Sequence, residues 1–248
     1  MKPKVAFFDF TCCEGCQLQI ANLEEDLLAV LNLVEIVEFR EVYSGKAPSY
    51  DVAFIEGSIS RPADEERIKD IRSRAKVLVA FGACATTGGV NKIKNLWGNI
   101  DKVKMEVYGK DFAMPHLDTY PTKAVHEVVP VDYKIHGCPI TRSEFLKVVK
   151  ALVFGTTPDI PEYPVCVECK ARGNECMYDK GQVCIGPITR AGCNAICPSN
   201  NSPCEGCRGV VPNPNKNSMQ EVLAKYKLTP DDIMRQFTMF AIEPEATK

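Results

Sequence analysis

The chain has 248 residues, of which 45% are hydrophobic and 25% are charged, and its formal net charge is −2. This length suffices for one large domain or for a domain with a smaller appendage, and the composition is that of an ordinary globular protein. The charge gives no basis for binding nucleic acid or an anionic membrane, and no apolar stretch is long enough to span a bilayer. The N-terminus MKPKVAFFDF lacks a secretory signal pattern, so we expect a cytoplasmic protein.

Residues 1–155 alternate between strand and helix patterns. Apolar segments rich in β-branched or aromatic residues predict strands at 4–10, 34–42, 51–57, 76–84 and 131–138. Helical patterns follow at 16–33, 62–75 and 141–155, the last with a capping box formed by Thr141 and Glu144. This alternation predicts an α/β fold, a flavodoxin-like, doubly wound and mostly parallel sheet. We expect Trp97 and the aromatic residues of the first strand to lie in its core.

The pattern changes after residue 155. Three prolines interrupt residues 156–165, and residues 156–216 are rich in Cys, Gly, Pro and Asn without a regular apolar period. Such a segment buries too little apolar surface to fold alone, so something else must hold it together. Residues 217–248 are predicted to form a C-terminal helical tail. The chain therefore divides into an α/β domain (1–155), a small irregular Cys-rich segment (156–216) and this tail.

Five cysteines follow predicted strands of the first domain: Cys12, Cys13, Cys16, Cys84 and Cys138. The carboxyl ends of parallel strands meet at one edge of a sheet, so we expect these thiols to lie near one another. A single cysteine at a strand end is often only a small buried hydrophobe. Five of them at three strand ends favour coordination, and four thiolates suit a cubane iron–sulfur cluster or a tetrahedral zinc ion.

The second region contains eight cysteines in 42 residues: Cys166, Cys169, Cys176, Cys184, Cys193, Cys197, Cys204 and Cys207. The odd total of thirteen, without an export signal, argues against a disulfide framework and favours metal binding. Their number predicts two four-thiol sites. The terminal CxxC pairs also fit a zinc ribbon, and spacing alone does not separate zinc from iron. Several metal sites in one chain favour electron transfer over a structural staple.

Three motifs of the first domain, CEGC (13–16), GACATTGG (82–89) and GCP (137–139), resemble the proximal-cluster motif of NiFe-hydrogenase small subunits. The later motifs CVEC, CIGPITRAGC, AICP and CEGCRG resemble the soluble, multimeric (group 3) branch of that family. The resemblance implies an oxidoreductase small subunit that carries three [4Fe-4S] clusters. Its large subunit would split H2 at a Ni-Fe centre, and a further flavin or iron–sulfur subunit would pass electrons to an acceptor that the sequence does not identify.

The resemblance also implies a role for twelve of the cysteines. The proximal cluster would take Cys13, Cys16, Cys84 and Cys138; the medial cluster Cys193, Cys197, Cys204 and Cys207; and the distal cluster Cys166, Cys169, Cys176 and Cys184, although neighbouring sites could exchange a ligand. Glu14 is a candidate proton relay, with a solvent-facing loop residue as the alternative. Residues 94–121, a long stretch of low periodicity, are expected to contact the large subunit.

Two other interpretations stay open at this point. A small-subunit homologue of a complex I-like oxidoreductase, without nickel, would use tandem cysteines such as Cys12 and Cys13 together with similar GxC and GCP elements. That family lacks the eight-cysteine region. A zinc-stapled binding module belongs to a different class and would be redox-silent, but the sequence offers no basic surface for nucleic acid. In the hydrogenase interpretation Cys12 is a spare thiol at the strand end.

Overall fold

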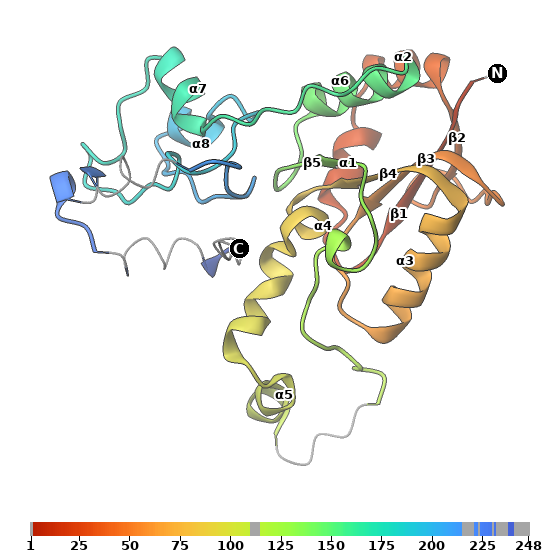
Figure 1. Ribbon diagram of the computed structural model, residues 1–248, viewed down its shortest axis with the longest axis horizontal. Coiled ribbons are helices and arrows are strands. Elements are labelled where there is room, and N and C mark those ends of the chain that lie inside the picture. Colours follow the sequence, from red (N-terminus) through yellow and green to blue (C-terminus); the bar gives the residue numbers. More distant parts are fainter. Residues whose placement is uncertain are drawn as a thin grey trace.

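A five-stranded sheet forms the centre of the first domain in the computed structural model (Figure 1). The structure describes residues 2–109, 115–214, 221–222, 224–229, 231 and 238–240. The strands are β1 (Lys4–Asp9), β2 (Glu35–Phe39), β3 (Tyr50–Glu56), β4 (Ala75–Phe81) and β5 (Tyr133–Ile135). They run in the order β2-β1-β3-β4-β5 and every pairing is parallel. This flavodoxin-like order confirms the predicted α/β sheet.

Helices cover both faces of this sheet (Figure 1). One face carries α1 (Gly15–Ala21), α2 (Glu25–Leu33) and α6 (Arg142–Val153), and the other carries α3 (Pro62–Arg74) and the short η2 (Val125–Glu127). Along β1, Val5 and Phe7 belong to the first core, while Ala6 and Phe8 belong to the second. Because both faces are buried, the strand is a continuous apolar run rather than an alternating one.

The predicted helix at 16–33 is interrupted. Helix α1 ends at Ala21 and α2 begins at Glu25, and between them Glu24 has a φ of 56°. Leu23 in this connection is buried in the core. The chain therefore bends so that two short helices, rather than one straight helix, bury their apolar residues against the same face of the sheet.

The predicted capping box of α6 is wrong. Thr141 occupies the N-cap position, but its side chain makes no capping hydrogen bond. Its hydroxyl instead donates to the Gly192 carbonyl at 3.3 Å, and Glu144 pairs with the buried Arg208. Partners from the Cys-rich segment have replaced the local backbone groups with which these side chains were expected to bond.

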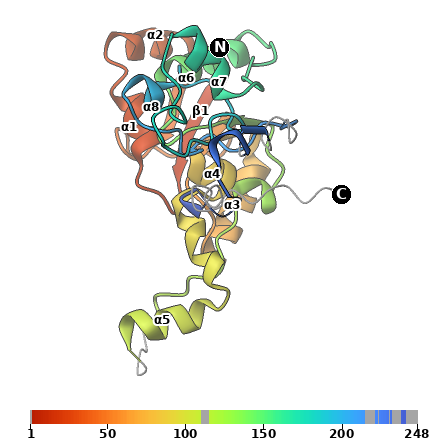
Figure 2. The same ribbon diagram turned by 90° about the vertical axis from the view of Figure 1, so that its left-hand side faces the viewer.

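The segment after β4 forms an arm rather than part of the core. After α4 (Ala83–Thr87) it contains the 3-10 helix η1 (Gly89–Trp97) and then α5 (Ile100–Tyr108), which lies at the end of a projection from the molecule (Figure 2). Trp97 is 71% exposed, so the expectation that it lies in the core is wrong. The arm carries this residue away from the sheet. Residues 110–114 of the predicted interface stretch lie outside the described residues.

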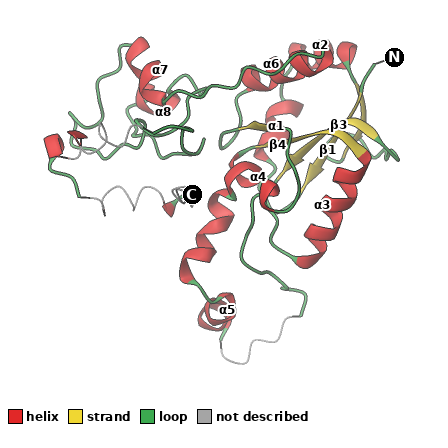
Figure 3. Ribbon diagram, in the orientation of Figure 1, coloured by secondary structure: helices red, strands yellow, loops and turns green. Residues whose placement is uncertain are grey.

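The Cys-rich segment consists mostly of loops, with only α7 (Val165–Ala171) and α8 (Ile196–Ser199) as α-helices among its described residues (Figure 3). Its small core contains Val165, Met177 and Tyr178 together with the cysteines Cys184 and Cys204. Most of the predicted tail, 217–248, lies outside the described residues. Among the residues that are described, no helix has the length and apolar character needed to cross a membrane.

Candidate metal centres

The first group of thiols lies at the carboxyl edge of the sheet. Cys13 and Cys16 come from the β1–α1 connection, Cys84 from α4 directly after β4, and Cys138 from the loop after β5. The pKa of the Cys84 thiol is raised to about 12, first by burial and then by the nearby Cys138 and Cys13. The pKa of Cys16 is raised by burial first, then by Glu56, and Cys84 also contributes. The fold therefore brings thiols from three distant segments together.

Gly82 allows this close approach. It has a φ of +86°, and a Cβ atom at this position would lie 2.5 Å from the Cys16 Sγ. Both the backbone conformation and the space exclude a larger residue here. The GAC element therefore has two roles. Its cysteine is Cys84, and its glycine leaves room for the thiol of Cys16.

Sequence reasoning missed Glu56, a buried carboxylate at the end of β3. Its two oxygens accept hydrogen bonds from the backbone N–H groups of Cys16 and Gln17, both at 3.0 Å. The pKa of Glu56 is raised by burial, although these two bonds lower it. An acidic residue at the N-terminus of α1 satisfies N–H groups that have no partner within the helix. The available signal was a charged residue ending the apolar run DVAFIE at the same edge as the cysteines.

Glu14 lies at the rim of this group, with its side chain in an ion pair. It has a φ of 61° directly before α1, and its Oε1 lies 3.0 Å from Nη2 of Arg40. The same Arg40 nitrogen lies 3.2 Å from Oδ2 of Asp9. The pKa of Glu14 is raised, first by burial and then by the neighbouring Glu41 carboxyl group. A raised pKa makes a carboxyl group easier to protonate, whereas the ion pair with Arg40 favours its charged form.

Cys12 differs from the other four thiols of this domain because it forms a hydrogen bond with the backbone directly after β1. Its thiol donates to the Phe10 carbonyl at 3.5 Å. Its pKa is raised to about 12 by burial and by Glu56, with a smaller contribution from Cys84. Cys12 is thus near the other four thiols, but its hydrogen bond is directed to the backbone of the preceding strand.

The eight later thiols form two neighbourhoods. The pKa of Cys166 is raised to about 12, first by burial and then by Cys184, Cys169 and Cys176. The pKa of Cys207 is likewise raised to about 12, first by burial, with Cys193 and Cys197 also raising it. Cys184 lies where the two neighbourhoods meet.

Hydrogen bonds at this junction are directed to sulfur. The Cys204 N–H donates to Cys184 Sγ at 3.2 Å, and Gly186 supplies a second backbone N–H to the same sulfur. The Asn174 amide donates to Cys169 Sγ at 3.7 Å. N–H groups directed at sulfur favour the thiolate over the thiol.

The donor set fits iron–sulfur clusters. The thirteen cysteines are free thiols, and burial holds many of them in the neutral form unless a cation replaces the proton. Across the described ranges, no group of three or more His, Cys, Asp or Glu side chains converges on a single metal ion. Thiolates that bind a cubane attach to separate iron atoms and need not converge on one point.

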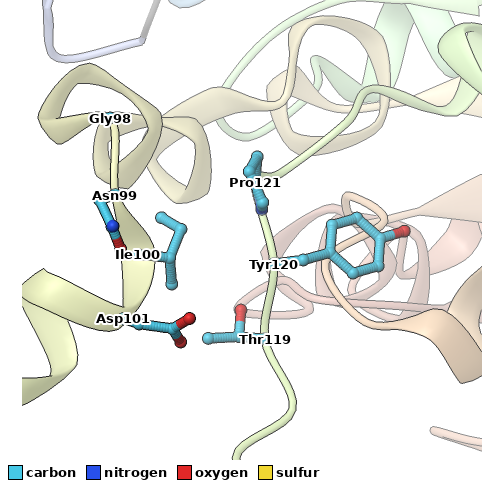
Figure 4. A pocket seen from close by; sticks show the side chains of 7 residues that line it. All are labelled: Gly98, Asn99, Ile100, Asp101, Thr119, Tyr120 and Pro121. Carbon is cyan, nitrogen blue, oxygen red and sulfur yellow. The ribbon is translucent and has the colours of Figure 1, made fainter.

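A cavity of about 420 Å³ lies between the start of α5 and residues 119–121 (Figure 4). It is lined by Gly98, Asn99, Ile100, Asp101, Thr119, Tyr120 and Pro121. No thiol lines it, so it does not belong to the candidate metal centres.

Comparison with known proteins gives matches over both regions. The family described as "NADH ubiquinone oxidoreductase, 20 Kd subunit" matches residues 13–152. Sulfhydrogenase 2 subunit delta of Pyrococcus furiosus is 38% identical over 240 residues, covering 96% of this chain and 99% of that protein. A protein of the F420-non-reducing hydrogenase vhu of Methanococcus voltae is 33% identical over 238 residues, covering 84% and 82%.

A solved structure of an NAD+-reducing [NiFe]-hydrogenase in the H2-reduced state aligns with a TM-score of 0.58 and 27% identity. The match covers 65% of this chain and 96% of that one. The family match ends at residue 152, before the Cys-rich segment, whereas the Pyrococcus furiosus protein is similar over nearly the whole chain. Similarity to a hydrogenase subunit therefore extends across the segment that contains the eight later cysteines.

Proposed function

The chain belongs to the NiFe-hydrogenase small subunits, and we propose that it relays electrons within a multimeric hydrogenase. Its residues 13–152 match the 20 kDa subunit of NADH ubiquinone oxidoreductase. It is a hydrogenase subunit, and the H2-splitting site lies on the large subunit. Electrons would pass between that Ni-Fe site and a further subunit carrying flavin or iron–sulfur groups. Three [4Fe-4S] clusters are the proposed cofactors, and the cytoplasm is the proposed location.

One observation carries this proposal: the eight later cysteines form two adjoining groups beside the first group of four. Cys184 accepts a hydrogen bond from Cys204, and the N–H of Cys138 donates to Cys207, so the three groups adjoin in succession. A succession of redox sites suits electron transfer over a distance that one site could not span. A relative named as a hydrogenase subunit matches 96% of the chain, including the segments that contain all three groups.

The residues of the chain would hold the clusters as follows. The proximal cluster would be bound by Cys13, Cys16, Cys84 and Cys138, the medial one by Cys193, Cys197, Cys204 and Cys207, and the distal one by Cys166, Cys169, Cys176 and Cys184. Bound clusters supply one-electron carriers. The chain contributes the thiolates, the backbone N–H groups that tune them, and the burial that excludes water.

The exposure of the thiols suggests which face meets which partner. Cys13 and Cys138 are exposed at the sheet edge, and Cys176 is exposed in the Cys-rich segment. We place the large subunit at the first face and the further electron-transfer subunit at the second. The arm presents exposed apolar side chains, among them Leu96, Trp97 and Val107, which would pack against the large subunit.

The test is the metal content of the complex, purified without oxygen after co-expression with its partner subunits. We expect about twelve iron atoms per chain and an absorption near ~400 nm that bleaches on reduction, as three cubanes would give. Nickel should co-purify with the large subunit. Zinc in place of iron would contradict the proposal and favour a stapled binding module.

Iron without nickel would favour the second candidate, a subunit of a complex I-like oxidoreductase. The match of residues 13–152 to the 20 kDa subunit of NADH ubiquinone oxidoreductase favours this candidate. It would use Cys12 and Cys13 as tandem ligands, together with Cys84 of the GAC element and Cys138 of the GCP element.

A separate measurement tests Glu14 as a proton relay. The Glu14→Gln substitution should slow H2 turnover while iron content stays unchanged, because the amide cannot exchange a proton in the same way. Glu66→Gln is the matched control, since it removes an exposed carboxylate on α3 that does not contribute to the pKa of Glu14. Equal turnover in the two variants would overturn the relay.

A further inference from the structure

Arg208 is a fully buried cation between the Cys-rich segment and the α/β domain, and its side chain is 1% exposed. It directly follows Cys207 in the motif CEGCRG. A guanidinium group removed from water destabilises a protein unless it is paired and hydrogen-bonded. The contacts of the Arg208 guanidinium therefore indicate why a buried charge is kept at this position.

The guanidinium of Arg208 bonds in three directions. Its Nε donates to the Ala191 carbonyl at 2.6 Å, and its Nη1 donates to the His136 carbonyl. Its Nη2 lies 2.7 Å from Oε1 of Glu144, a carboxylate that is itself buried. Two of these partners, His136 and Glu144, belong to the α/β domain, and Ala191 belongs to the Cys-rich segment.

Two of these contacts, those with Ala191 and His136, lie close in sequence to a proposed ligand. Ala191 precedes Cys193 by two residues, and His136 precedes Cys138 by two residues. One side chain therefore holds a segment of the first thiol group and two segments of the group Cys193–Cys207. Where these groups meet, the Cys138 N–H donates to the Cys207 sulfur.

The surroundings are shaped for this guanidinium. Gly192 has a φ of +112°, and a Cβ atom there would lie 2.3 Å from Nη2 of Arg208 and 3.3 Å from Oε1 of Glu144. Thr141 adds a hydrogen bond to the Gly192 carbonyl across the same boundary. Glycine is thus required where the two regions close around the ion pair.

We propose that Arg208 is a positioning residue that fixes the Cys13–Cys138 group relative to the Cys193–Cys207 group and so sets the rate of electron transfer between them. The proposal rests on the proposed function. Electron tunnelling slows exponentially as the donor and acceptor move apart, so a small shift between the two groups would change the rate strongly. Lysine cannot replace arginine here, because only the planar guanidinium donates in three fixed directions.

The experiment uses the complete complex with Arg208→Lys. Iron content should be retained, because no proposed ligand is removed. The magnetic interaction between the two reduced groups, measured by electron paramagnetic resonance, should weaken, and electron transfer between them should slow. Arg74→Lys is the matched control, since Arg74 bonds Asp70 and the Ala47 carbonyl, both within the α/β domain. We expect this control to leave the magnetic interaction unchanged.

The paired variant Arg208→Met/Glu144→Leu separates positioning from stability. Replacing both members of a buried ion pair by apolar residues leaves no unpaired charge, so the complex should unfold at a similar temperature. The magnetic interaction should be weakened in this paired variant too. If Arg208→Lys loses iron, the paired variant becomes the test of whether Arg208 positions the two groups. An unchanged interaction in the paired variant would overturn the proposal. A wild-type complex without iron would instead overturn the proposed function.

Discussion

The α/β domain and the Cys-rich segment have interiors of different chemistry. In the sheet, Phe54 packs against Phe7 and Phe145 with ring centroids 5.0 Å and 5.4 Å apart. In the segment, Cys184 and Cys204 are themselves core residues. Aromatic burial stabilises a fold whatever is bound, whereas clustered thiols stabilise it fully only when a metal replaces their protons. The first domain can therefore support itself, and the second region depends on its cofactor.

Removing iron should have the largest effect and should separate the two regions. We expect a chelator under reducing conditions to make residues 156–214 sensitive to protease while the sheet of the first domain and the helices that cover it stay protected. Cofactor binding at structural metal sites supplies on the order of 10 kcal/mol of folding free energy. Limited proteolysis with mass spectrometry measures this, and adding iron and sulfide back should restore protection. Digestion of both regions at the same rate would contradict the inference that only the Cys-rich segment depends on its cofactor for stability.

A single thiol should have the next largest effect. Cys184→Ser removes a sulfur that accepts N–H groups from Cys204 and Gly186, and we expect a loss of about four irons per chain, the content of one cubane. Cys12→Ser is the matched control and should keep all its iron. Loss of iron from the Cys12 variant would favour the tandem-ligand alternative instead.

The aromatic core should respond to a cavity without any change in iron. Phe54→Ala removes a ring that contacts three other phenylalanines, and we expect the domain to lose about 3–5 kcal/mol of unfolding free energy. Urea unfolding followed by circular dichroism measures the loss. Trp97→Ala, a substitution of an exposed aromatic residue, should change stability by less than about 0.5 kcal/mol. A drop in iron content in the Phe54 variant would show that the two interiors are not independent.

The smallest effect is expected at the opposite edge of the sheet, far from the thiols. Asp51 accepts the Lys4 N–H at 2.8 Å and pairs with Lys76 at 2.7 Å, and the hydrogen bond from Lys76 is the first cause of its lowered pKa. A lowered carboxyl pKa stabilises the fold above the ordinary pKa of 3.8 and loses this effect as the pH falls through the folded value.

Because this pair is partly exposed, Asp51→Asn should cost only about 0.5–1 kcal/mol at neutral pH. The difference from wild type should disappear at an acid pH below the folded pKa of Asp51. Urea unfolding of the iron-free chain at both pH values tests this, and a difference that persists in acid would contradict the assignment to charge.

The parts of this structure that depend on local pattern could be predicted from the sequence. The apolar run of β1 and the prolines after residue 155 mark the sheet and its end. The meeting of Cys16, Cys84 and Cys138 follows because parallel strands share a carboxyl edge.

What could not be predicted depends on distant partners. Thr141 and Glu144 form a good local capping pattern, yet Arg208, 64 residues further along, takes the carboxylate. Glu56 is similar, because its partners are N–H groups 40 and 39 residues before it. Trp97 looked like a core residue because size and apolarity indicate burial on average, but the arm carries it outward.

The close packing of Gly192 against Arg208 and Glu144 also limits which segments of this protein can be exchanged with those of a relative. A chimera that took its Cys-rich segment from another hydrogenase would need a host domain with an acid at position 144, and a donor segment with both Gly192 and Arg208. An alanine at position 192 or a neutral residue at 144 would leave the transplanted arginine without room or without a counter-ion. These three residues, scattered over 65 positions of the chain, would have to be exchanged as one unit.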